Sequence, residues 1–127
     1  MTGFVDPADP AAVEAVLAKG LTALRVPALL DQLASVPDLD VQPARRGGIF
    51  KAPTPAAVGF GDRRLVIDDR SAVLEHWVGG VVLARDPVAR AALPGALAAL
   101  VCRAVAAGGA ADEVSVLLTA LRDAVSI

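Results

Sequence analysis

Two side chains that could perform chemistry occur once each in this chain, His76 and Cys102. A histidine acts as a general acid or base efficiently when a neighbouring group orients its ring. Glu75 is adjacent in sequence, so it points elsewhere on either a helix or a strand. Asp68 and Asp69 lie upstream and would supply an orienting carboxylate only by folding back toward the imidazole. We therefore interpret His76 as a surface or half-buried residue and expect a protein that is not an enzyme.

Cys102 stands in an apolar stretch beside Arg103, a cation that could lower the pKa of a thiol. Neighbours on a helix project about 100° apart, so we expect instead a buried, inert cysteine that packs as a small hydrophobic residue. A single cysteine forms no internal disulfide. The first six residues lack the basic and apolar regions of a signal peptide. These features predict a cytoplasmic protein.

Metal and nucleotide sites have little support in the sequence. One His and one Cys in different segments provide no ligand spacing. The acidic pairs Asp38/Asp40 and Asp68/Asp69 are explained by turn and cap chemistry. Three glycine pairs occur, but none stands in the strand–GxGxxG–helix or GxxxxGK(S/T) context that cradles a phosphate. We expect no cofactor and no metal.

Basic residues gather in one quarter of the chain: Arg45, Arg46, Lys51, Arg63, Arg64 and Arg70. If this region folds on itself, a phosphate-binding patch would consist of Arg45, Arg46, Arg63 and Arg64. Nearby aspartates partly offset these charges, and a net charge of −2 creates no global attraction for nucleic acid. The simpler interpretation is a solvated rim. Binding of nucleic acid or another anionic ligand through the Arg45–Arg64 region is therefore an alternative function.

Helix signals occur at both ends of the chain. Asp9 and Pro10 suit the cap and first position of a helix that carries apolar residues to Leu24. A short helix follows from Pro27, and Pro37 closes it. Near the other end, Asp86-Pro87 predicts a helix restart, and Pro94 a break before a helix over residues 94–107. A last helix from about Asp112 is linked to it through Gly108-Gly109, which predicts an αα-hairpin.

The middle of the chain predicts one β-hairpin. Residues 37–56 are rich in Pro and Gly and predict a loop, with a short strand at Ile49–Lys51. Strands at residues 57–60 and 64–67 flank a turn at Gly61-Asp62-Arg63.

Residues 71–85 are ambiguous. Paired apolar residues recur every four positions and favour a helix with Trp77 in the core, whereas valines and Gly79-Gly80 favour a strand or a bend. We favour the helix. The predicted fold is a single α+β, α-rich domain spanning residues 1–127, with N-terminal helices, one β-hairpin and a C-terminal helical bundle that ends in the αα-hairpin.

Composition supplies the main indication of function. The chain is 55% hydrophobic and only 20% charged, with a mean hydropathy of +0.58. A domain of this size does not easily hide so much apolar surface. The window 91–111 has the length of a membrane span but contains Pro94, Arg103 and several glycines, so we expect no membrane contact.

We therefore predict a non-enzymatic interaction or assembly protein that forms a homodimer through apolar helix faces. The last helix is apolar around most of its circumference, and we place four of its residues in or near the interface: Leu117, Leu121, Val125 and Ile127. The same apolar faces could instead bind a different protein partner. A second alternative is a small enzyme or apolar-ligand carrier with a pocket near His76 and Trp77.

Overall fold

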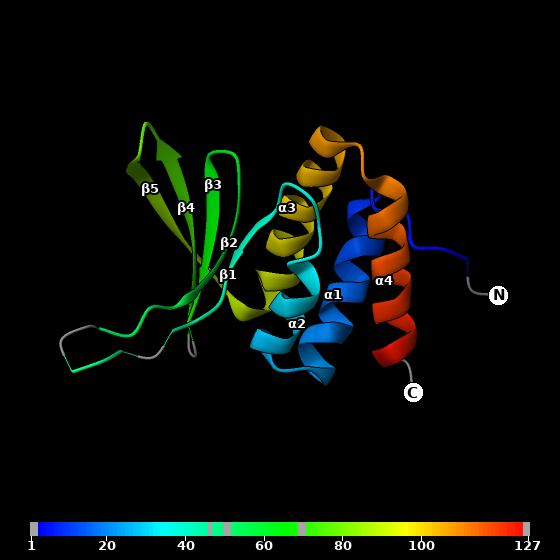
Figure 1. Ribbon diagram of the computed structural model, residues 1–127, viewed down its shortest axis with the longest axis horizontal. Coiled ribbons are helices and arrows are strands. Elements are labelled where there is room, and N and C mark those ends of the chain that lie inside the picture. Colours follow the sequence, from blue (N-terminus) through cyan, green and yellow to red (C-terminus); the bar gives the residue numbers. More distant parts are fainter. Residues whose placement is uncertain (1–2, 46, 50–51, 69–70, 126–127) are drawn as a thin grey trace.

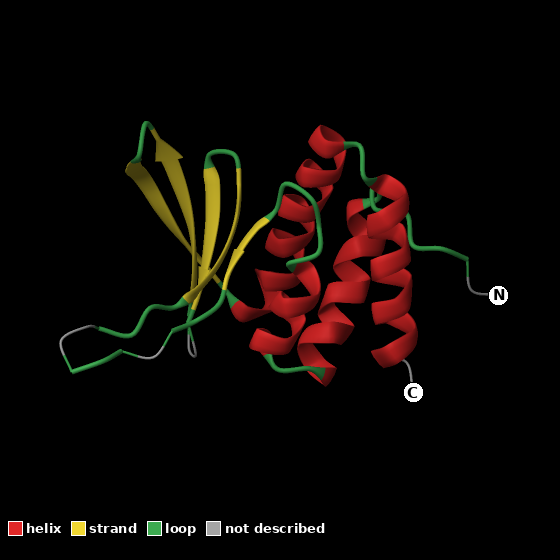
Figure 2. Ribbon diagram, in the orientation of Figure 1, coloured by secondary structure: helices red, strands yellow, loops and turns green. Residues whose placement is uncertain are grey.

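The computed structural model describes residues 3–45, 47–49, 52–68 and 71–125. In this part of the chain, four α-helices lie beside a five-stranded antiparallel sheet (Figures 1 and 2). Two helices precede the sheet and two follow it. The α+β class, with helices at both ends of the chain, is confirmed.

The N-terminal helices follow the predicted signals. α1 spans Pro10–Ala23, and the Asp9 Oδ1 accepts a hydrogen bond from the Ala11 N–H at 3.1 Å. α2 spans Val26–Leu33 and has Pro27 in its first turn. A Cβ placed on Gly20 would lie 3.1 Å from Leu29 Cδ1. Gly20 therefore allows the side chains of α2 to approach the backbone of α1 closely.

The C-terminal helices are also as predicted from Pro94 onward. A 3-10 turn, η1 (Arg90–Ala92), leads into α3 (Leu93–Gly108), and α4 spans Ala111–Val125. Gly109 has φ +67°, and its N–H donates to the Val105 carbonyl at 3.0 Å. The two helices run antiparallel, which confirms the αα-hairpin (Figure 1). α1 packs against both of them more extensively than they pack against each other.

The sheet is a meander in the order β1-β2-β3-β4-β5. Its strands are β1 (Asp40–Gln42), β2 (Ala56–Phe60), β3 (Arg63–Ile67), β4 (Ala72–Val78) and β5 (Val81–Val88). The predicted hairpin is confirmed as β2 and β3, but a single hairpin is too few strands. β1 lies inside the segment predicted to be a loop. Ile49 lies in a turn, and the other two residues of the predicted strand at 49–51 lie outside the described residues.

The helix predicted over residues 71–85 is wrong, because this segment forms β4 and most of β5. Gly79 and Gly80 have φ values of +59° and +82°. Two consecutive positive φ values are the geometry of the two-residue turn that joins hairpin strands. The predicted restart at Asp86-Pro87 is also wrong, since both residues lie in β5. Pro87 is compatible with an edge strand, where its missing N–H costs no ladder bond.

The core lies between the helices and one face of the sheet, which we call the helix-side face. Val58 and Leu65 are opposite each other in the β2–β3 register and are fully buried. They join a core dominated by Leu17, Leu29, Leu30, Leu33, Leu97 and Leu118. The helices contact the sheet mainly through β1, β2 and β3. The β4–β5 hairpin therefore extends beyond the helical layer (Figure 1).

Candidate functional site

The face of the sheet turned away from the helices, here called the outer face, carries a row of charges. The cross-strand register places Asp40, Gly59, Arg64, Glu75 and Arg85 side by side across the five strands. Charge alternates along this row apart from Gly59. Opposite charges on neighbouring strands stabilise a sheet modestly, so the row is accounted for by structure alone.

Trp77 lies on the outer face, two residues after Glu75 on β4. The predicted core position of Trp77 is wrong, because the side chain is half-buried and stands on the face that the helices do not cover. Its indole Nε1 donates to Glu75 Oε1 at 3.2 Å, and the Arg85 Nε donates to Glu75 Oε2 at 3.2 Å. The Glu75 side chain is only 13% exposed. One carboxylate therefore holds both the indole and the guanidinium in place.

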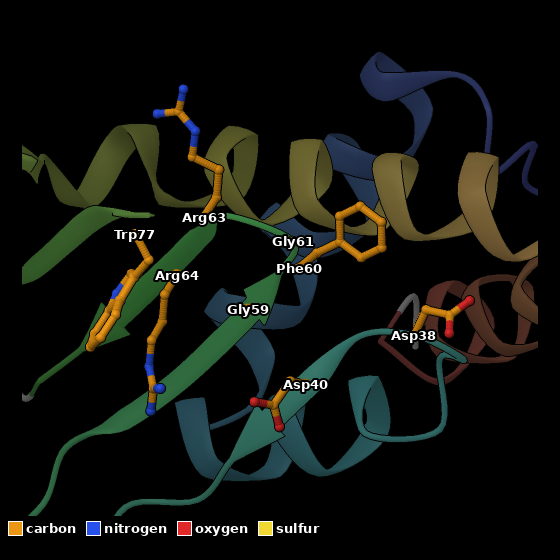
Figure 3. A pocket seen from close by; sticks show the side chains of 8 residues that line it. All are labelled: Asp38, Asp40, Gly59, Phe60, Gly61, Arg63, Arg64 and Trp77. Atoms are coloured by element: carbon orange, nitrogen blue, oxygen red, sulfur yellow. The ribbon is translucent and has the colours of Figure 1, made fainter. Parts of the chain in front are cut away.

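A hollow of about 270 Å³ opens at the edge of this face (Figure 3). It is lined by Asp38, Asp40, Gly59, Phe60, Gly61, Arg63, Arg64 and Trp77. This volume is below the range of about 300–1,000 Å³ that holds most small ligands. No lining residue is a Ser, Thr or Cys nucleophile. The hollow has the charge to orient a polar group but lacks the depth to enclose a substrate.

Two of the arginines predicted to bind phosphate, Arg63 and Arg64, point away from each other. Arg63 and Arg64 are successive residues of β3, so their side chains leave opposite faces of the strand (Figure 3). Arg64 Nη2 donates to Gln42 Oε1, and Arg63 Nε lies 3.8 Å from Asp62 Oδ1. Arg45 forms an isolated antiparallel β-bridge with Thr54, which precedes the start of β2 and so lies at the end of that strand far from Arg63. Arg46 lies outside the described residues. Arg63 and Arg64 therefore do not contribute to the same patch.

His76 has an orienting carboxylate, but from a residue that the sequence did not indicate. The Nε2 of His76 lies 3.0 Å from Asp62 Oδ2, and the Trp77 N–H donates to the Asp62 carbonyl at 2.7 Å. Asp62 is in the β2–β3 turn, beside Arg63, which pairs with His76 in the sheet register. Asp68, by contrast, donates its N–H to the Ser71 carbonyl, and Asp69 lies outside the described residues. His76 does not line the hollow beside Trp77, and its contact with Asp62 fastens the β2–β3 turn to β4.

Three of the four residues predicted to form an interface lie in the described part of α4. Leu121 is 5% exposed and belongs to the protomer's own core. Leu117 and Val125 are half-buried against that core, and Ile127 lies outside the described residues. Val116, which is 58% exposed, is the large apolar side chain that α4 presents to solvent.

The polar strip of α4 binds the N-terminal segment. Val5 N–H donates to Thr119 Oγ1 at 2.9 Å, and Ser115 Oγ donates to the Val5 carbonyl at 2.6 Å. Arg122 Nη1 donates to the Gly3 carbonyl at 2.7 Å. The side chain of Val5 is buried. These contacts explain why polar residues recur along an otherwise apolar helix.

Cys102 is half-buried in α3 rather than fully buried. Burial, followed by the nearby carboxylates of Asp9 and Asp6, raises the pKa of its thiol above the ordinary value. A raised pKa leaves little of the nucleophilic thiolate at neutral pH. Cys102 is therefore a poor candidate for covalent chemistry.

A metal site and a membrane-spanning helix are the two remaining possibilities on the described part of the chain. It holds no group of three or more His, Cys, Asp or Glu side chains that could bind a metal ion. One helix, Arg90–Gly108, is long and apolar enough to cross a membrane by length and composition. Its residues Leu97, Val101 and Ala104 are fully buried in the core.

Comparison with protein-family models, with curated proteins and with solved structures finds no match to this chain.

The feature that sequence reasoning missed is the tip of the β4–β5 hairpin. Three large apolar side chains stand in solvent there: Val78 at 51%, Val81 at 59% and Leu83 at 63% exposure. The Val78-Gly79-Gly80-Val81 segment carried the signal, since Gly-Gly between β-branched residues is a recognised hairpin turn. The helical spacing of the neighbouring apolar residues obscured it.

Proposed function

We propose that this chain is a small non-enzymatic interaction protein that self-associates as a homodimer. The observation that supports this proposal is surface that the protomer leaves uncovered. Its accessible area is 7795 Å². A compact monomer of 12.9 kDa exposes about 6,300 Å² according to the general scaling of surface with mass. The difference is about 1,500 Å², beyond the roughly 800 Å² per partner of a standard interface.

The shape of the molecule explains where this area comes from. The β4–β5 hairpin and the described residues between β1 and β2 (43–45, 47–49 and 52–55) both project from the body of the molecule (Figure 1). The hairpin adds exposed aliphatic side chains, of which Leu83 is the most exposed. Contiguous apolar surface of this kind marks association sites. The two alternative functions receive less support, because the arginines diverge and the hollow beside Trp77 is small.

Sedimentation equilibrium at micromolar concentration tests the proposal. We expect a mass of about twice the 12.9 kDa of one chain, with a fraction of dimer that rises with concentration. The same result is expected at low and high salt, because apolar contacts are insensitive to screening. A mass of one chain over the whole micromolar range would show that the protein does not self-associate.

A further inference from the structure

The β4–β5 hairpin tip, residues 77–83, is apolar on both of its faces. The register pairs Trp77 with Val82 on the outer face and Val78 with Val81 on the opposite face. Residues 77–84 include no charged side chain. An antiparallel hairpin normally alternates between one buried face and one polar, solvated face. This tip has no polar face, and the helices contact the sheet mainly through the other three strands.

The edge of β5 is poorly suited to pairing with another strand. The β4–β5 register shifts at His76/Trp77, and Pro87 has no N–H to donate. Arg85 and Asp86 place charges along the same strand. Bulges, proline and charges on an edge strand are the devices that prevent edge-to-edge pairing. A partner at this hairpin therefore packs against side chains instead of extending the sheet.

The charges around the hairpin indicate what kind of partner fits. Three carboxylates and three guanidinium groups lie on the turn and strands beside the tip: Asp62, Glu75 and Asp86, and Arg63, Arg64 and Arg85. Two of these carboxylates are already paired, Glu75 with Arg85 and Asp62 with His76. A strongly acidic or basic partner, such as nucleic acid or an anionic membrane, finds no complementary field here. A surface with the same balanced charges meets it without repulsion.

From these observations we infer that the hairpin tip of one chain packs against the hairpin tip of a second copy. The inference rests on the proposed self-association and names the surface that carries it. A contact between identical patches is isologous and closes as a twofold dimer. It covers Val78, Val81 and Leu83 together with the half-buried Trp77 and Val82.

The test compares Val81→Lys with Val116→Lys. The two valines are 59% and 58% exposed, and Val116 lies on α4, away from the hairpin. Both variants place the same charge on an equally exposed apolar position, Val81 at the hairpin tip and Val116 on a helix. We expect Val81→Lys to raise the dimer dissociation constant at least tenfold and Val116→Lys to change it less than twofold. Far-UV circular dichroism and urea midpoints check that both variants fold, and Leu83→Asp replaces Val81→Lys if that variant does not.

Tryptophan emission supplies a second readout, because Trp77 is the chain's single tryptophan. Diluting the wild type through its dissociation constant should move the emission to longer wavelength as the indole becomes more exposed to water. Folded Val81→Lys should show the monomer's emission at all concentrations. Unchanged emission on dissociation would overturn the inference.

The outcomes separate this inference from the proposed function. A wild-type protein that is monomeric would contradict both the proposed homodimer and the interface at the hairpin tip. A dimer that Val116→Lys dissociates and Val81→Lys does not would place the interface on α4 and overturn only the inference. Flotation of monomeric wild type with neutral phosphatidylcholine vesicles, lost in Val81→Lys, would identify the tip as a membrane contact and would also overturn it.

Discussion

The indole Nε1 of Trp77 donates a hydrogen bond to Glu75 Oε1 at 3.2 Å on the outer face of the sheet. The two residues are separated by one position on β4 and so share a face. Glu75 also accepts from the Arg85 Nε on the neighbouring strand. The Glu75 carboxylate therefore joins the indole of Trp77 to the row of charged side chains that crosses the outer face of the sheet.

Removing that carboxylate should destabilise the protein. Glu75→Ala leaves the half-buried Trp77 indole without its acceptor and removes the partner of the exposed Arg85, so we expect a loss of about 1 kcal/mol in the free energy of unfolding. Glu75→Gln keeps one acceptor and should lose less. Urea denaturation followed by Trp77 fluorescence measures both changes. Asp31→Ala, at an exposed position of α2, is the control and should change stability by less than about 0.5 kcal/mol.

The turn of the β4–β5 hairpin should respond to backbone geometry alone. A Cβ at Gly80 would meet no atom within 4 Å, yet its φ of +82° is one that side-chain-bearing residues rarely adopt. Gly80→Ala should therefore lower the free energy of unfolding by about 1–2 kcal/mol. Gly79→Asn is the matched variant, because asparagine tolerates the left-handed region and suits the first position of this turn. Equal thermal midpoints for the two variants would argue against the turn described here.

Two helical glycines should behave in opposite ways. A Cβ at Gly20 would lie 3.1 Å from Leu29 Cδ1 in the core, whereas one at Gly95 would lie 2.7 Å from Glu14 Oε1, the end of a flexible exposed side chain. Gly20→Val should destabilise by about 1–3 kcal/mol through overpacking. Gly95→Ala should stabilise by up to about 1 kcal/mol, because alanine is the better helix former. Guanidinium denaturation of both variants gives the comparison.

Cys102 should react slowly with thiol reagents. Burial raises the pKa of its thiol, and nearby Asp9 and Asp6 add to the effect, so thiolate is scarce at pH 8. Alkylation by iodoacetamide, followed by mass spectrometry, should be slower for the folded protein than for the urea-unfolded chain. Because the pKa is higher in the folded state than in the unfolded state, the thiol contributes stability below the ordinary pKa. That contribution should be lost as the pH rises through the folded-state pKa, in the alkaline range. Folded and unfolded protein reacting at one rate would contradict the burial.

The arginine geometry predicts weak or absent binding to nucleic acid. Arg63 and Arg64 leave opposite faces of β3 and cannot bind adjacent phosphates together. Filter binding of the wild type to duplex DNA at low salt should show no retention. Retention that falls steeply with added salt, and falls further in Arg63→Ala/Arg64→Ala, would contradict this prediction and favour a phosphate-binding surface.

Local signals in the sequence determined most of the helical part of the fold. Helix caps and first-turn prolines change only the backbone of the adjacent helical turn. Their effect can therefore be predicted without knowing what the helix packs against, as at Asp9-Pro10, Pro27, Pro94 and Gly109. The turn at Gly61-Asp62 is equally local, and the β2–β3 hairpin around it was predicted for that reason.

Tertiary structure decided the elements whose local signals conflict. Residues 71–85 satisfy a helical spacing and a strand composition together, and pairing of β4 with β3 selects the strand. That choice moves Trp77 from the predicted core to the outer face and brings Asp62 to His76. Packing of α4 against α1 likewise places Leu121 inside the protomer. Each outcome depends on register or packing between distant segments. The spacing of apolar residues along one segment does not specify which other segment will lie beside it.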